Sequence, residues 1–102
     1  MSKLNFFYGR SSVFEVSLQA LQRRKYKVLE TDPVNGIIKA KSKPGLLKPS
    51  VAVEIHIQQI SEQQTTLDIH SRINKNWLTP DNYESAAEKK FIYTLYKCFE
   101  KR

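Results

Sequence analysis

The chain of 102 residues is 40% hydrophobic and 11% aromatic, which suits one domain with one core and leaves no room for a second. A charged fraction of 26%, with only three glycines and four prolines, excludes a low-complexity or disordered composition. The formal net charge of +7 favours association with anions, although lysines that serve only solubility would give the same balance.

The first ten residues, MSKLNFFYGR, contain an apolar cluster that is too short for an export signal. Asn5 and Arg10 interrupt it before a signal-peptide core of about 7–15 apolar residues could form, and no membrane-spanning run of about 18 follows. The lone Cys98 cannot form an internal disulfide. We therefore expect a cytoplasmic protein without a transmembrane segment.

The cluster of Leu4, Phe6, Phe7 and Tyr8 adds a short leading strand or packs on a helix.

A first helix is predicted from Ser12 to about residue 24. The run Ser12-Val13-Phe14-Glu15 has the form of a capping box, in which serine and glutamate side chains satisfy free N–H groups of the first turn. An apolar stripe at spacings of three and four should face the core. Its members are Phe14, Leu18 and Leu21, with Val13, Ser17 and Ala20 beside them.

The next segment, YKVLETDPVNGIIKAKS, predicts a β-hairpin around residues 32–36. Proline fixes a turn φ, and Asn35-Gly36 tolerates positive φ. A two-residue turn at Asn35-Gly36 and a longer one that starts at Asp32 would send Val28 and Leu29 to opposite faces, so the register stays open. On the second strand we expect Ile38 and Ala40 to face inward, with Lys39 and Lys41 outward.

Two prolines then break the regular structure in SKPGLLKPS, where Leu46 and Leu47 lie between Lys43 and Lys48. Apolar residues in a loop need an explanation. Either at least one leucine tucks under the loop and closes an end of the core, or both form an exposed apolar tip ringed by lysines. Such a tip would suit an acidic partner with an apolar pocket or an anionic bilayer.

A second hairpin gives the strongest local pattern in the chain. Val51, Val53, Ile55 and Ile57 alternate with polar or small residues, and so do Leu67, Ile69, Ser71 and Ile73. Both strands share a core face only if paired residue numbers have an even sum. A sum of 124 places Glu54 opposite His70 and His56 opposite Asp68, whereas 126 places His56 opposite His70 and Glu54 opposite Arg72. Either sum gathers five polar residues on the solvent side: Glu54, His56, Asp68, His70 and Arg72.

These two acid-Ile-His triplets could be metal ligands or ordinary cross-strand pairs. Imidazole and carboxylate groups suit zinc, and directly opposed residues are close enough. Side chains on an open sheet stand roughly parallel, however, and nothing orients the histidines or excludes water. We therefore expect acid–histidine pairing across the strands, with no metal and no cofactor.

A second helix is predicted in TPDNYESAAEKKFIYTLYKCFEKR, with Thr79 as its cap, proline in the first turn and Asp81 and Glu84 near its positive end. Its inward stripe contains Ala87, Phe91, Leu95 and Cys98, flanked by Ile92 and Phe99. The elements together predict one α+β domain over residues 1–102. The expected fold is a two-layer sandwich with a four-stranded antiparallel meander, an N-terminal and a C-terminal helix on one face, and a possible extra N-terminal strand.

Most of the positive charge falls between residues 23 and 48. The bases there are Arg23, Arg24, Lys25, Lys27, Lys39, Lys41, Lys43 and Lys48, and the acids are Glu30 and Asp32, so eight minus two leaves +6. We predict a non-enzymatic binding module for an anionic partner, such as an acidic protein, a lipid headgroup or a small anion. Leu46 and Leu47 would belong to the same surface.

Nucleic acid is the alternative partner, and it would need aromatic side chains interleaved with bases. Tyr26 lies within the basic segment, while Tyr93 and Tyr96 near Lys89, Lys90 and Lys97 suggest amphipathic packing. An enzyme is the remaining reading, without support from a phosphate-binding loop or a catalytic triad pattern. Cys98 lies on an apolar stripe, where a buried thiol resists ionisation and acts as a small hydrophobe.

The order of these signals resembles a bacterial family catalogued only as domain of unknown function 1499. The similarity covers Tyr26 and Val28, Asp32, Gly36-Ile37 and Ala40, the alternation of Val51, Val53 and Ile55, the run Leu67-Asp68-Ile69-His70-Ser71-Arg72, and Asp81 before an alanine-rich helix start. The resemblance implies no activity. It points to Ser71 and Arg72 as positions of interest.

Overall fold

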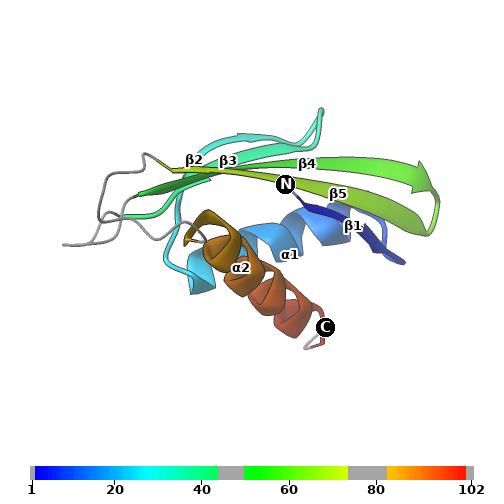
Figure 1. Cartoon of the computed structure of the whole chain (residues 1–102). Coiled ribbons are helices and arrows are strands. Elements are labelled where there is room, and N and C mark those ends of the chain that lie inside the picture. Colours follow the sequence, from blue (N-terminus) through cyan, green and yellow to red (C-terminus); the bar gives the residue numbers. More distant parts are fainter. Residues whose placement is uncertain (1, 44–49, 74–82, 101–102) are drawn as a thin grey trace.

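An antiparallel sheet of five strands forms one layer, and two helices lie together on one of its faces (Figure 1). The computed structural model describes residues 2–43, 50–73 and 83–100. The elements are β1 (Ser2–Phe6), α1 (Arg10–Arg23), β2 (Lys27–Asp32), β3 (Ile37–Lys41), β4 (Val51–Ser61), β5 (Gln64–Ile73) and α2 (Tyr83–Glu100). In the sheet the strands follow the order β1-β5-β4-β3-β2. The α+β class is confirmed, and the expected count of four strands is wrong.

The additional strand is β1, which pairs with the outer side of β5 and places Leu4 opposite Leu67. It precedes α1, so the chain order is β-α-β-β-β-β-α in place of α-β-β-β-β-α. Phe6 is buried and its ring lies 4.6 Å from that of Phe99 on α2, centroid to centroid. The apolar cluster of the first ten residues therefore makes a strand and also packs on a helix.

Helix α1 begins two residues earlier than expected, and the capping-box prediction is wrong. Gly9 is the N-cap without a side-chain hydrogen bond, and Val13 N donates to Gly9 O at 3.1 Å, so Ser12 is already inside the first turn. The buried stripe contains Val13, Val16, Ser17, Ala20 and Leu21. Phe14 and Leu18 are only partly buried, which shifts the stripe by about one position.

The first hairpin uses the longer of the two turns, which starts at Asp32. Gly36 N donates to Asp32 O at 2.8 Å, and Gly36 adopts a φ of +70°. A bulge between Val28 and Glu30 leaves Leu29 exposed, while Val28 packs against the core. Ile38 and Ala40 are buried and Lys39 and Lys41 exposed, as expected. Arg10 at the start of α1 donates from Nη2 to the carbonyl oxygens of Pro33 and Val34 and ties the helix to this turn.

The second hairpin adopts the register with a sum of 124. Glu54 lies opposite His70 and His56 opposite Asp68, with one irregularity between Gln59 and Ser61 near the turn. The inward residues of both strands form the centre of the core. Those buried residues are Val51, Val53, Ile55, Ile57, Leu67 and Ile69.

Helix α2 lies under β5 and beside α1, and buries Phe91, Leu95, Cys98 and Phe99 as expected. Glu88, one turn before Phe91, is buried too, which the apolar stripe did not predict. Tyr93 and Tyr96, for which the sequence suggested amphipathic packing, are 64% and 46% exposed. The proposed cap at Thr79, with Asp81, lies outside the described residues. Neither described helix is long and apolar enough to cross a membrane.

Candidate anion-binding surface

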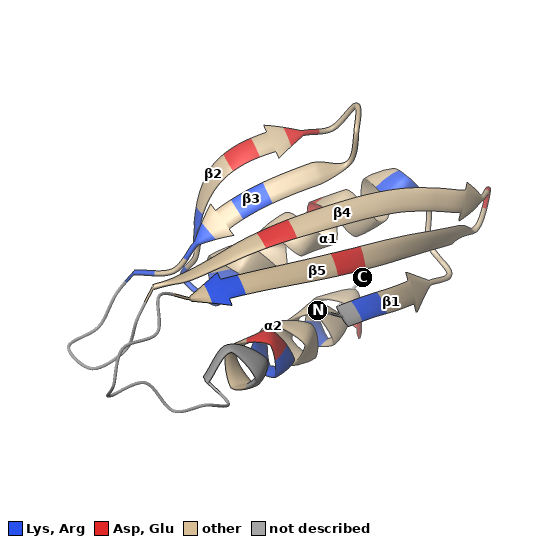
Figure 2. Ribbon diagram, turned by 45° about the horizontal axis from the view of Figure 1, so that its top comes forward, with Lys and Arg blue, Asp and Glu red and all other residues tan. Residues whose placement is uncertain are grey.

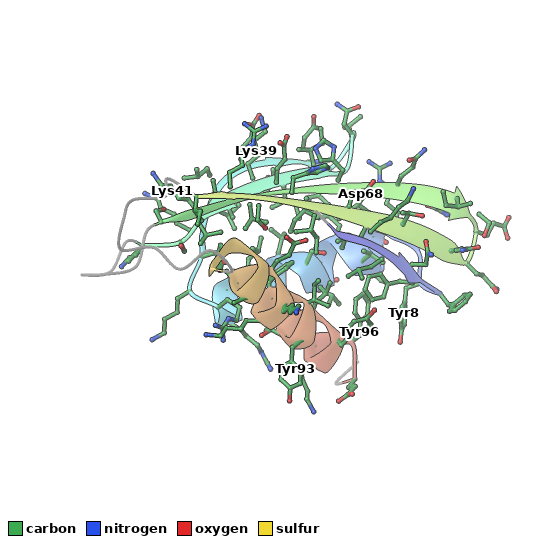
Figure 3. All side chains as sticks on the ribbon, in the orientation of Figure 1. Tyr8, Lys39, Lys41, Asp68, Tyr93 and Tyr96 are labelled. Carbon is green, nitrogen blue, oxygen red and sulfur yellow. The ribbon has the colours of Figure 1, made fainter. Side chains whose placement is uncertain are left out.

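The face of the sheet opposite to the helices, here called the outer face, carries all five residues of the expected polar cluster. In Figure 3 the labelled side chains of Lys39, Lys41 and Asp68 lie on this face, away from α2. Glu54, His56, Asp68 and His70 are half-buried and Arg72 is exposed. The residues between them along β4 and β5 are buried in the core, as the alternation predicts.

An open hollow of about 690 Å³ lies on the outer face over β2, β3, β4 and β5. Ala52 contributes to its floor, because a methyl group stands where its neighbours carry long side chains. The outward side chains around it are Leu29, Lys39, Glu54, His56, His70 and Arg72.

The centre of the outer face is a network of opposite charges. Lys39 Nζ lies 3.6 Å from Glu30 Oε2 and 3.9 Å from Glu54 Oε1. The same Glu54 oxygen lies 3.2 Å from His56 Nε2. The charge of Lys39 is thus balanced by two carboxylates, so this lysine of the basic segment contributes little free positive charge.

The expected cross-strand pairing of acid with histidine is wrong, although the strands adopt one of the two registers that the alternation allowed. Glu54 bonds along its own strand to His56, since residues two apart share a face and Lys39 on β3 draws the carboxylate to that side. The ring of His70 meets the ring of His56 edge-on, with centroids 5.7 Å apart. Over residues 2–43, 50–73 and 83–100, no group of three or more His, Cys, Asp and Glu side chains is arranged to hold a metal ion.

At one end of the outer face, basic side chains lie together without carboxylates to neutralise them. Lys27 lies opposite Lys41, Lys41 opposite Ala52, and Ala52 opposite Arg72, which makes one row across four strands. Adjacent strands are about 4.8 Å apart, so Lys41 and Arg72 flank Ala52 at a backbone separation of about 10 Å. Among the described residues, no carboxylate lies within ion-pair distance of these three bases.

Other bases of the segment lie at the same end of the molecule. Helix α1 ends at Arg23, and Lys25 adopts a φ of 61° in the turn that leads into β2 at Lys27. Lys43 follows the end of β3 and is exposed. Figure 2 shows blue segments on β2, β3 and β5 at this end of the sheet, and a further one in the middle of β3. The basic end is defined here by Arg23, Arg24, Lys25, Lys27, Lys41, Lys43 and Arg72.

The basic end differs from the sequence prediction in its members. Lys39 is drawn into the central network, and Leu46, Leu47 and Lys48 lie outside the described residues. Arg72, which the sequence placed with the polar cluster, joins the row beside Lys41. The register of β3 against β4 decides this, and no local sequence pattern encodes it.

Other proteins resemble this chain in fold and not detectably in sequence. No family model matches it and no curated protein is similar to it, so the resemblance to domain of unknown function 1499 stays a prediction. Ser71 and Arg72, the residues to which it points, face opposite sides of the sheet. Ser71 is buried on the helix side and Arg72 is exposed on the outer face.

Solved structures share the fold at low sequence identity. A chain of the adenylate sensor from AMP-activated protein kinase, in complex with the ribofuranotide ZMP, has a TM-score of 0.70 at 15% identity, over 91% of this chain and 94% of that one. The same sensor complexed with ATP gives 0.70 at 14% identity with the same coverage. The di-domain ARO/CYC StfQ from steffimycin biosynthesis gives 0.67 at 10% identity, over 95% of this chain and 42% of that one. These likenesses concern the fold alone.

Proposed function

We propose that this chain is a non-enzymatic binding module whose basic end contacts an anionic partner. The row of Lys27, Lys41 and Arg72 carries the proposal, because it presents like charges side by side with no carboxylate near them among the described residues. Like charges placed directly opposite each other in a sheet are destabilising. A bound anion would relieve that repulsion.

The chemistry of the row suits an oxyanion. The guanidinium of Arg72 can donate two parallel hydrogen bonds to a phosphate or carboxylate, and Lys41 supplies a mobile point charge from the other side of Ala52. The methyl group of Ala52 leaves space between them for the anion. Acidic side chains, lipid headgroups and small phosphates all offer such groups.

The setting of the two histidines supports the non-enzymatic part of the proposal. His56 and His70 lie on an open face, and among the described residues neither receives a hydrogen bond from a hydroxyl or a thiol. Cys98, the lone thiol, is buried on the other side of the sheet. A histidine without a nucleophile to activate and without exclusion of water is poorly placed for catalysis.

The test compares two variants that lose the same charge at different places. One carries Lys27→Gln, Lys41→Gln and Arg72→Gln in the basic end, and the control carries Lys89→Gln, Lys90→Gln and Lys97→Gln on the exposed side of α2. The probes are pyrophosphate, an acidic peptide and vesicles rich in anionic lipid, none of which carries a base that could stack on the aromatic side chains of α2.

We expect the wild type and the α2 control to bind at least one probe with affinity that rises as salt falls. The basic-end variant should lose most of that binding. Equal losses in both variants would show that net charge alone is responsible, and the proposal would then be wrong. The probe that binds best identifies the source of the anionic group.

A further inference from the structure

A second surface combines aromatic rings with lysines on the exposed side of α2. Lys89, Lys90 and Lys97 are exposed there, together with Tyr93 and Tyr96. Lys97 Nζ lies 5.5 Å from the centroid of the Tyr93 ring, in a cation–π contact, and 3.6 Å from Glu100 Oε2, so the unbalanced charge of this surface comes from Lys89 and Lys90. This side of the helix faces away from the sheet, and the basic end lies on another part of the molecule.

The surface continues from α2 onto the segment after β1. The rings of Phe6 and Phe99 stack at 4.6 Å, and those of Phe99 and Tyr8 stack at 4.7 Å, with interplanar angles of 26° and 23°. This column of three rings begins in the core and ends at Tyr8, which is 41% exposed. Phe7, beside it, is 82% exposed. A column that ends at an exposed ring offers its last face to a further planar group.

An open hollow of about 490 Å³ lies where the two parts meet. Tyr8 and Tyr96 project beside each other from the underside of the molecule in Figure 3, with Tyr93 further along the helix. Asn5 and Glu100 supply the polar groups of the lining. The aromatic strip is defined here by Phe7, Tyr8, Lys89, Lys90, Tyr93, Tyr96 and Lys97.

We infer that the aromatic strip binds single-stranded nucleic acid, with bases stacked on its tyrosines and phosphates near its lysines. Stacking on aromatic side chains beside positive charge is the usual way in which proteins hold single strands without reading their sequence. Lys89 and Lys97 are eight positions apart, which is about 12 Å along an α-helix. The strip is therefore long enough for a few nucleotides.

Two other occupants fit the strip less well. An anionic bilayer binds more strongly as more apolar area is buried in it, and Phe7 is the one residue of the strip without a polar or charged group on its side chain. A second copy of the chain, docked through the same surface, would bring Lys89, Lys90 and Lys97 against their own copies. Nucleic acid supplies both the planar rings and the negative charge.

The experiment measures fluorescence anisotropy of a labelled single-stranded DNA of about twelve nucleotides, in parallel with an abasic strand of equal length and charge. The abasic strand keeps the phosphates and lacks the rings. We expect the wild type to bind the base-bearing strand at least about fivefold more tightly, since one stacked base contributes about that factor or more. Equal affinity for both strands, or no binding at low salt, would overturn the inference.

Substitutions separate stacking from charge. The variant with Tyr8→Ser, Tyr93→Ser and Tyr96→Ser keeps every charge and should reduce the preference for the base-bearing strand to near unity. The matched variant with Tyr8→Phe, Tyr93→Phe and Tyr96→Phe keeps the rings and should bind like the wild type. Ile60→Ser, at an apolar residue 58% exposed near the end of β4, is the control for lost exposed apolar area.

Three further results would count against the strip. They are binding of anionic vesicles that the serine variant abolishes, self-association that the serine variant abolishes, and nucleic-acid binding that only the basic-end variant removes. Circular dichroism of each variant confirms that it is folded. The inference is independent of the proposed function, because the basic-end variant retains the whole strip and the serine variant retains the whole basic end.

Discussion

Gly36 is the single residue on which the first hairpin depends most. Its φ of +70° is a conformation that residues with a side chain rarely adopt, and a Cβ there would overlap the carbonyl oxygen of Ile57. The Gly36 carbonyl also accepts from Ile57 N at 2.7 Å, so the turn cannot move away without losing that bond. The close approach joins the β2–β3 turn to β4.

We therefore expect Gly36→Ala to lower the free energy of unfolding by at least about 1–3 kcal/mol, the cost of the left-handed conformation alone, with the overlap adding to it. Urea denaturation measures the change. Gly9→Ala is the matched control, because nothing lies within 4 Å of a Cβ at Gly9 and its φ of −67° suits alanine. Equal stability of both variants would contradict this account of the turn.

Asp32 gives the turn a pH dependence. The side chain of Asn35 donates to Asp32 Oδ2 at 2.8 Å and its backbone N–H donates to Oδ1 at 3.2 Å. These bonds, the side-chain bond first, hold the pKa of Asp32 below its usual value of 3.8. A lowered pKa in the folded state means that the carboxylate stabilises the fold above pH 3.8 and that this contribution is lost as the pH falls through the folded-state pKa.

Asp32→Ala should therefore be less stable than the wild type at neutral pH, and the difference should shrink on acidification below pH 3.8. Melting temperatures measured from about pH 2 to about pH 7, a range that brackets the usual carboxylate pKa, give this difference in stability. Asn35→Ala should remove most of the same pH-dependent part, since its side chain makes the largest contribution. A pH-independent difference between Asp32→Ala and the wild type would refute the argument.

At the scale of elements, the packing of β1 can be tested by substitutions at two neighbouring phenylalanines. Phe6 is 4% exposed and stacks on Phe99, whereas Phe7 is 82% exposed. Phe6→Ala should cost about 3–5 kcal/mol because a large buried ring leaves a cavity, and Phe7→Ser should stay within about 0.5 kcal/mol. Guanidinium denaturation compares the two. Similar losses at both positions would mean that β1 does not pack as described.

The elements differ in how far the sequence could predict them. The second hairpin was predictable because alternation along both strands leaves few registers that keep Val53, Ile55 and Ile69 together. β1 offered only Leu4 and Phe6 as an alternating pair, and its partner β5 is distant in sequence. The start of α1 was misplaced because Ser12 and Glu15 fit a cap equally well when they lie inside the first turn.

The site was less predictable than the fold because side-chain partners depend on three strands at once. Glu54 could have bonded to His70 across the strands, yet Lys39 on the next strand and His56 on its own strand hold it. Ionic partners of exposed side chains are decided by small energy differences that local pattern does not encode.

At the scale of the whole molecule, charge balance divides the outer face into a paired centre and an unpaired end. Lys41→Glu places a carboxylate opposite Lys27 and should raise stability by about 0.2–1 kcal/mol at low salt. Lys39→Glu, two residues away, puts a third carboxylate between Glu30 and Glu54 and should lower it. Urea denaturation at low salt and at about 1 M salt measures both changes, which should shrink at high salt. Stability changes of the same sign in both variants would contradict the division into a paired centre and an unpaired end.

The position of β1 at the rim of the sheet also has a consequence for the order of folding. Leu4 near the start of the chain finds its partner Leu67 only after the β2–β5 meander has been made, whereas each strand of that meander adjoins its neighbour in sequence. Contacts between distant residues form late because loop closure costs entropy. During synthesis on a ribosome, β1 and α1 would therefore be made before the meander and remain without their sheet partners. The outer edge of β5 would stay unpaired until β1 binds to it.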